Sequence, residues 1–333
     1  MQGRILKYFL YSLVALLSAR VGQAQTAAIQ VKVSKNRSSE NVEKAVFGIG
    51  ELTGNPIAIS RADLDGDGRD ELLVLLDDLL LAYKVHRHSL SIYARLGLEH
   101  FPRSATRVRK PVGSLAAMYM DLDKREEIAF NTGSIAQGAI IYWSGLRFIR
   151  LDTLSGMPLA MGRRNDGKFM LLGKLAPGTS LYASICIKRL QMDQCDEQMI
   201  GQQSLAVTAT RDLEYISALH QDGTVHTWGT DGVELPVVKN CGEALAVTEL
   251  EGKGLPELVV SAPVLPPGPD RVKVMNLEGE GAPTPLWISR PIPGVVRAIT
   301  TGGFESAASN EIIIAYTDEK SESGKTKLME VEW

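Results

Sequence analysis

The feature that most constrains the fold is a nine-residue acidic loop that leads directly into an apolar segment. Residues 63–71 read Asp-Leu-Asp-Gly-Asp-Gly-Arg-Asp-Glu, and the run Leu72–Leu76 follows without a break. The aspartates alternate, at Asp63, Asp65 and Asp67, and the two glycines between them and after them permit a tight bend of the backbone. The junction predicts a cation-binding turn between two β-strands.

The pattern of acidic residues indicates which cation the loop could hold. Ca²⁺ takes six to eight oxygen ligands, and carboxylates on alternating residues of a bent backbone can converge on one ion. An EF-hand would need a Glu at position 12 and a helix on each side, whereas that position is Val74 in a strand-like run. An acidic surface turn is the alternative. We expect one structural Ca²⁺ bound by the carboxylates of positions 1, 3, 5 and 9 and the carbonyl of position 7: Asp63, Asp65, Asp67, Glu71 and Arg69.

The loop resembles the FG-GAP/VCBS repeat, the unit of integrin-α-type β-propellers, in which D-x-D-G-D-G-x-x-[D/E] connects two strands of a blade. The resemblance implies a calcium-binding propeller built from four-stranded blades. It also implies that related units recur along the chain at the spacing of one blade.

Related units do recur. Five more segments place an acidic residue before an apolar strand: 249–257, 303–311, 121–127 (two residues shorter), and the weaker 162–172 and 208–217. An apolar strand precedes most of the loops, at 57–59, 115–118, 205–207, 245–247 and 295–299. Only the first loop keeps every acidic position, and Lys253 replaces the central Asp in the loop at 249. We therefore expect one well-formed calcium site and several vestigial ones.

The repeats predict an all-β fold, a single propeller over residues 25–333. Strand, acidic loop, strand, turn and strand repeat at a little over forty residues, as in four-stranded blades. Six blades are expected, and seven are the alternative because 58 residues separate Asp63 from Asp121. We expect the early strand 28–33 to complete the last blade beside the C-terminal strand 327–333 and to close the ring.

The N-terminus predicts export. Residues 1–7 form a short basic segment, and residues 8–19 are apolar. The small residues Gly22 and Ala24 suit cleavage before Gln25. The apolar core is too short to span a bilayer, so residues 1–24 read as a cleavable signal peptide of a secreted or periplasmic protein, with no transmembrane segment in the mature chain. Its removal takes away three basic residues and shifts the formal net charge from −3 to −6, which disfavours nucleic acid as a partner.

Three cysteines are present, at Cys186, Cys195 and Cys241. In an oxidising compartment the first two are close enough in sequence to form a disulfide that staples a hairpin. Reduced and buried thiols are the alternative for both. Cys241 is then unpaired, either buried or free.

No pattern in the sequence indicates catalysis. His86 and His88 lie two residues apart and could share one face of a strand, but a third metal ligand is not evident. Three hypotheses follow: a non-catalytic, monomeric module that binds a protein or glycan, a polysaccharide lyase or hydrolase with its site at the central channel, and a periplasmic assembly scaffold. Convergent ionisable groups at the channel mouth would favour the enzyme.

Overall fold

The computed structural model describes most of the chain from residue 44 onward, and these residues belong to one compact unit, Asn41–Trp333. The predicted signal peptide 1–24, the early strand 28–33 and Cys195 lie outside the described residues. The described residues are 44–52, 54–99, 114–120, 123–132, 138–154, 157–163, 169–174, 182–188, 191–194, 204–229, 231–251, 254–263, 269–279, 281–317 and 325–333.

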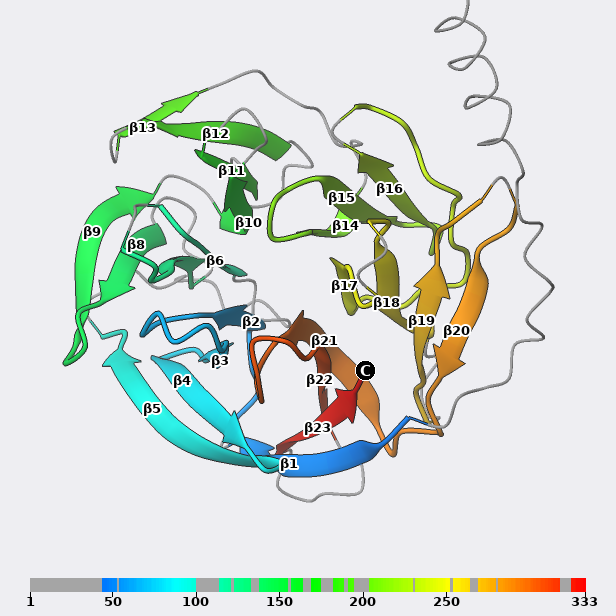
Figure 1. Cartoon of the computed structure of the whole chain (residues 1–333), viewed down its shortest axis with the longest axis horizontal. Helices are drawn as coiled ribbons and strands as arrows, with labels where there is room; N and C mark the ends of the chain where they lie inside the picture. Colours follow the sequence, from blue (N-terminus) through cyan, green and yellow to red (C-terminus); the bar gives the residue numbers. More distant parts are fainter. Residues whose placement is uncertain are drawn as a thin grey trace, which may run out of the picture. The chain divides into compact units, whose positions relative to one another are not determined.

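The regular structure of the described residues consists of β-strands, arranged as antiparallel meanders (Figure 1). Five sheets have four strands, and the sheet of β14, β15 and β16 has three. The structure therefore confirms an all-β propeller of four-stranded blades, but with five such blades and not six or seven. In the described part of the chain, no helix has the length and apolar character needed to cross a bilayer.

The first three sheets in chain order contain twelve strands. They are β2 (Ala58–Ala62), β3 (Glu71–Leu75), β4 (Leu79–His86) and β5 (Ser89–Gly97); β6 (Ser114–Met118), β7 (Glu127–Asn131), β8 (Gly138–Trp143) and β9 (Phe148–Leu154); and β10 (Met157–Arg163), β11 (Phe169–Lys174), β12 (Tyr182–Lys188) and β13 (Gln191–Gln194).

The remaining three sheets contain eleven strands. They are β14 (Ser204–Ala209), β15 (Tyr215–His220) and β16 (Val225–Gly229); β17 (Leu245–Thr248), β18 (Glu257–Ser261), β19 (Val272–Asn276) and β20 (Thr284–Ile288); and β21 (Val295–Gly302), β22 (Glu311–Thr317), β23 (Thr326–Glu332) and β1 (Val46–Leu52).

The first strands of the sheets line the centre of this unit. β2 contacts β6 and β21, β10 contacts β6 and β14, and β17 contacts β14 and β21, so these contacts form a closed cycle. β1 pairs antiparallel with β23, so the last sheet combines the first described strand with the last three strands of the chain. The prediction that an N-terminal strand completes the last sheet is confirmed, but the strand is Val46–Leu52 and not 28–33.

Apolar layers fill the spaces between neighbouring sheets. In β3, Leu73 and Leu75 pack toward the sheet of β6–β9, while Leu72 and Val74 pack toward the sheet of β21–β23. A strand covered on both faces needs apolar residues at every position, which explains why the run after the acidic loop does not alternate. Each residue of β3 is buried.

The last acidic residue has a common role in four of the loops. In four loops it is buried, and its carboxylate accepts a hydrogen bond from the backbone N–H seven residues earlier. The pairs are Leu64 N with Glu71 Oε2 (2.9 Å), Met120 N with Glu127 Oε2 (2.7 Å), Leu250 N with Glu257 Oε2 (2.7 Å) and Phe304 N with Glu311 Oε2 (2.7 Å). We call this hydrogen bond the loop brace.

The brace corrects the predicted alignment of one loop. Because Met120 matches Leu64, the second loop starts at Tyr119 and has the full nine positions, so it is not two residues shorter. Lys124 then stands where the first loop has Gly68, and both have positive φ, 67° and 85°. The sequence alignment failed because a lysine occupies a position that favours glycine.

The brace should stabilise the fold without a metal ion. We expect Glu257→Leu to lower the free energy of unfolding by about 1–3 kcal/mol, because it leaves the buried Leu250 N–H without an acceptor. Urea denaturation in the presence of chelator would measure it. The matched control is Glu251→Leu at an exposed position of the same loop, expected to change stability by about 0.5 kcal/mol or less. Equal losses in the two variants would contradict a structural role for the brace.

Candidate functional site

The Asp63 loop is organised by its first aspartate. Asp63 is buried, and its two carboxylate oxygens accept hydrogen bonds from Gly66 N (2.8 Å) and Gly68 N (3.0 Å). Both glycines have positive φ, 76° and 85°, a conformation that other residues rarely adopt. Tyr119 donates a further hydrogen bond to Asp63 Oδ2 (3.2 Å). The turn is therefore held by Asp63 itself, with both of its oxygens already engaged.

The Lys84 ammonium lies among the other carboxylates of the loop. Its Nζ is 2.7 Å from Asp65 Oδ2, 3.4 Å from Glu71 Oε1 and 3.5 Å from Asp67 Oδ2. Lys84 reaches them from β4, one residue beyond the pairing of Leu72 with Tyr83. An internal cation thus offsets part of the negative charge of the loop.

The pKa values of the loop follow from burial and from this cation. Burial raises the pKa of Glu71 to about 7, against the hydrogen bond from Leu64 N. Burial would also raise the pKa of Asp65, but its hydrogen bond to Lys84 and the charge of that ammonium outweigh the effect and lower it. For Lys84, the same contacts outweigh burial and raise the pKa.

The predicted calcium ligands are brought together in part. Ligand oxygens of Asp63, Asp65 and Glu71 lie within 4.8 Å of one another. Asp67 is 41% exposed and accepts a hydrogen bond from the N–H of Arg69, which lies in the exposed part of the loop. This oxygen-rich set fits a hard cation such as Ca²⁺. Asp65, Asp67 and Glu71 also contact Lys84, so a bound ion would compete with the ammonium.

The eighth position of the loops connects neighbouring sheets, a role that the sequence did not reveal. Asp70 N donates to Gly303 O (2.9 Å), and Gly303 N donates to Asp70 Oδ2 (2.9 Å). Glu126 makes the same reciprocal pair with Asp63 of the preceding sheet, at 2.9 and 2.8 Å. Asn310 Nδ2 donates to the carbonyl oxygen of Glu249 (3.3 Å). We call this contact the position-8 latch. Asp70 is buried and faces the centre.

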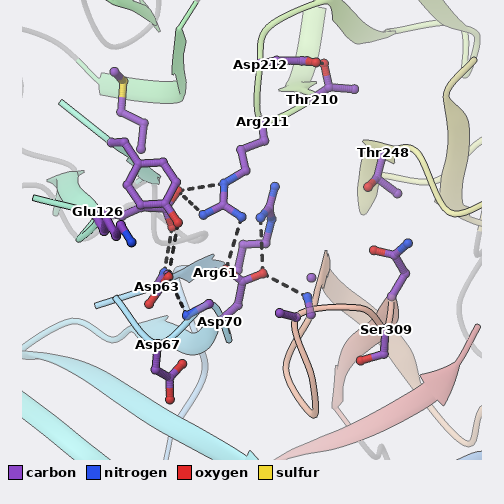
Figure 2. A pocket seen from close by; sticks show the side chains of 18 of the residues that line it. Arg61, Asp63, Asp67, Asp70, Glu126, Thr210, Arg211, Asp212, Thr248 and Ser309 are labelled. Carbon is purple, nitrogen blue, oxygen red and sulfur yellow. Dashed lines mark hydrogen bonds and ion pairs between the residues drawn. The ribbon is translucent and has the colours of Figure 1, made fainter. Parts of the chain in front are cut away.

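Two arginines join the latches into a charge network at the centre. Arg211 lies 2.7 Å from Glu126 Oε1 and 3.6 Å from Asp70 Oδ1, and Arg61 lies 3.3 Å from Asp70 Oδ2. Figure 2 shows both arginine side chains directed at Asp70. The guanidinium of Arg211 also lies 4.8 Å from the centre of the Tyr119 ring. Burial raises the pKa of Glu126, and the charge of Arg211 opposes that rise.

The network lies beneath a pocket of about 960 Å³ (Figure 2). Its wall is formed by loops that join the first two strands of five sheets. A narrower hollow of about 240 Å³ is lined by first strands of the sheets and shares Arg61, Glu126, Thr210 and Arg211 with the pocket. The wide pocket is thus the mouth of the central channel. Its polar lining residues are Arg61, Asp63, Asp67, Asp70, Tyr119, Lys124, Glu126, Thr210, Arg211, Asp212, Thr248, Glu249, Ser309 and Asn310.

The other candidate residues lie elsewhere. Cys186 is in β12 opposite Asp193, and its predicted partner Cys195 is outside the described residues, so the disulfide stays a prediction. Cys241 is a free thiol and is buried. His86 is exposed at the end of β4, whereas His88 contacts Glu330.

Comparisons with known proteins give a limited result. No family model matches the sequence, and no curated protein matches it. Among solved structures, the chain is similar to two crystal structures of BBS1N in complex with ARL6DN, one soaked with lead and one with mercury, each at 14% sequence identity. The alignments cover 86% and 87% of this chain and 97% and 98% of those chains, with TM-scores of 0.46 and 0.47. Similarity at this level does not bear on what this chain binds.

The charge network gives a prediction for Arg211→Met. We expect a loss of about 3–5 kcal/mol in the free energy of unfolding, because the variant leaves the buried Glu126 carboxylate without its arginine. Lys124→Met, at an exposed residue of the same mouth, is the control.

The loss in Arg211→Met should shrink as the pH falls. Burial raises the pKa of Glu126 and the charge of Arg211 opposes that rise, so the pKa rises further in Arg211→Met, and the folded variant binds this proton at a higher pH than folded wild type does. A folded state that binds more protons gains stability on acidification. Urea denaturation between about pH 5 and pH 8 would measure the trend, and a loss that grows toward low pH would contradict it.

Proposed function

We propose that this chain is a non-catalytic interaction module of the FG-GAP/VCBS type, which binds a protein or glycan at the channel mouth. The observation that carries the proposal is the pairing of the charges beneath the mouth. Arg61, Asp70, Arg211 and Glu126 contact one another, so they serve to hold the sheets together. A wide pocket above a fixed polar floor suits recognition.

The charge of the mouth suggests the chemistry of the partner. Outside the paired network, the lining carries the acidic residues Asp63, Asp67, Asp212 and Glu249 and the basic residue Lys124. An excess of acidic groups attracts a basic segment of a protein, or a glycan held through a bridging cation. We favour the basic protein segment, because it needs no further component.

An enzyme is the second candidate, because ionisable groups do converge on the channel mouth. Tyr119 would be the natural proton acceptor there, beside Arg211 and Asp63. Burial raises the pKa of Tyr119 to about 12, so the phenol stays protonated at neutral pH and is a poor base. This supports binding over turnover. Loss of polysaccharide cleavage in Tyr119→Phe, without loss of stability, would favour the enzyme.

An assembly scaffold would differ from the binding module in holding two partners at once.

We also propose that the three-stranded sheet is a sixth blade with a reduced fourth strand. The segment 233–238 bridges to β16 through Val225 with Val238 and Trp228 with Glu234. Leu235 N donates to Thr227 O at 2.8 Å. These contacts lie where the other sheets have their outermost strand.

Export remains a proposal that rests on the composition of residues 1–24, and N-terminal sequencing of the mature protein, expected to begin at Gln25, tests it.

Calcium binding is proposed for the Asp63 loop in competition with Lys84. We expect one Ca²⁺ per chain by calorimetric titration, and a melting temperature that falls with chelator and in Asp65→Ala. Lys84→Met should bind Ca²⁺ roughly tenfold more tightly, because the carboxylates lose their competing ammonium. Lys239→Met, an exposed lysine outside this loop, is the control.

Two outcomes would contradict the calcium proposal. If neither wild type nor Lys84→Met binds Ca²⁺, the Asp63 loop is not a calcium site. Three or more sites of similar affinity would mean that loops lacking the full acidic set also bind it.

The binding face is tested by reversing one charge. We expect Asp212→Lys to weaken capture of a partner from an extracellular or periplasmic fraction by roughly tenfold, because a rim charge then repels a basic segment. Glu278→Lys makes the same change at an exposed site that does not line the mouth. Quantitative pull-down measures both. Equal capture by the two variants would place the partner elsewhere.

A further inference from the structure

A second group of potential ligands lies away from the channel mouth. His88 is in the turn between β4 and β5, Glu305 is in the loop between β21 and β22, and Glu330 is in β23. The contacts of His88 with Glu305 and Glu330 join segments 217 and 242 residues apart in the sequence. One ligand atom of each residue lies within 4.8 Å of the other two. The structure therefore gives His88 two potential co-ligands, Glu305 and Glu330, neither of which is His86.

The turn holds His88 in a defined position. Arg87 and His88 both have positive φ, 48° and 57°, which makes a two-residue hairpin turn closed by the pairing of His86 with Ser89. His88 N donates to Glu305 Oε1 (3.1 Å). The imidazole ring stacks on Phe47 with ring centres 3.6 Å apart. Backbone and ring are thus both fixed before any ligand arrives, as a preorganised site requires.

Glu330 is the residue that the fold itself does not explain. Its side chain is 0% exposed. Its Oε2 lies 3.0 Å from His88 Nδ1, but no described residue gives its buried Oε1 a hydrogen bond. Its neighbour Leu328 belongs to the apolar layer between this sheet and the sheet of β2–β5. A buried carboxylate oxygen without a partner is costly, and a bound ion is one way to satisfy it.

The donors fit a divalent transition metal better than Ca²⁺. An imidazole nitrogen with two carboxylates suits Zn²⁺ and its neighbours in the first row, whereas Ca²⁺ takes oxygen ligands. The second ring nitrogen of His88 faces Glu332 Oε1 at 3.7 Å. A carboxylate at that nitrogen orients a metal-bound histidine and fixes its tautomer. Three protein ligands leave at least one coordination position open.

We infer that His88, Glu305 and Glu330 form a binding site for a divalent transition metal ion, with Glu332 orienting His88. The ion would tie the β4–β5 turn to β23, at the point where β1 closes the cycle of sheets. The site is separate from the Asp63 loop, because the two share no residue. It does not depend on the proposed binding function.

Titration of the untagged chain with Zn²⁺, and with Co²⁺ as a spectroscopic probe, tests the site. We expect one Zn²⁺ per chain and Co²⁺ absorption bands typical of mixed nitrogen and oxygen ligands. His88→Ala and Glu330→Gln should weaken Zn²⁺ binding by more than about a hundredfold, and Glu332→Gln by about tenfold. His86→Ala, an exposed histidine two residues away, and Asp65→Asn in the calcium loop should bind as wild type does.

The outcomes separate a metal site from an ion pair. Glu330→Gln keeps the size of the side chain, so it reports on binding even if His88→Ala fails to fold. Zn²⁺ binding that persists in Glu330→Gln, or that is lost in His86→Ala, would overturn the site. Absence of binding in wild type would leave His88 and Glu330 as a simple hydrogen-bonded pair and would also overturn it.

Discussion

The hydrogen bond of the buried glutamate that ends four of the loops is the interaction on which the architecture depends. Its carboxylate lies at the start of the second strand of a sheet and accepts the backbone N–H at position 2 of the loop, so it fixes how the chain leaves the first strand. Once that geometry is set, position 8 is aimed at the preceding sheet, where Asp70 and Glu126 reach the backbone of position 1. A local hydrogen bond thereby prepares the long-range one. The apolar layers between sheets stabilise the ring, but they are not directional and cannot set this register.

Much of the fold could be predicted because each acidic loop lies between two apolar strands, so that finding the loop also locates the strands. The strands β2, β6, β17 and β21 were located from apolar runs ahead of the acidic loops. The errors have physical causes. Lys124 adopts a positive φ that favours glycine, so the sequence pattern predicted one loop two residues too short. The segment 233–238 makes isolated bridges in place of a full strand, so its sheet has three strands.

The channel mouth was less predictable from the sequence, because its residues come from several sheets and lie together only when the ring of sheets is closed. The acidic set of the Asp63 loop was visible as a pattern within nine residues. Arg211 reaches Asp70 from a sheet that is far away in the sequence, and no local pattern marks this contact, whereas Arg61 lies in the same sheet, nine residues before Asp70. Lys84 is intermediate: it follows from the pairing of Leu72 with Tyr83, which places it beside Glu71 once the register of the hairpin is known. The register of neighbouring strands places Lys84 and Arg61 beside the loop, whereas Arg211 reaches Asp70 only when the cycle of sheets closes.

The brace and the cation site share one residue, Glu71, but they use different oxygens of its carboxylate. Glu71 uses Oε2 for Leu64 N, which leaves Oε1 facing Lys84 at 3.4 Å. In the loops at 249 and 303 the aspartates are gone, yet Glu257 and Glu311 keep the first of these contacts. The hydrogen bond therefore persists where the ligands do not, so the loop conformation does not require an ion. A cation at such a loop adjusts a structure that is already formed, and whether it is an ammonium or a metal ion depends on the few side chains around it.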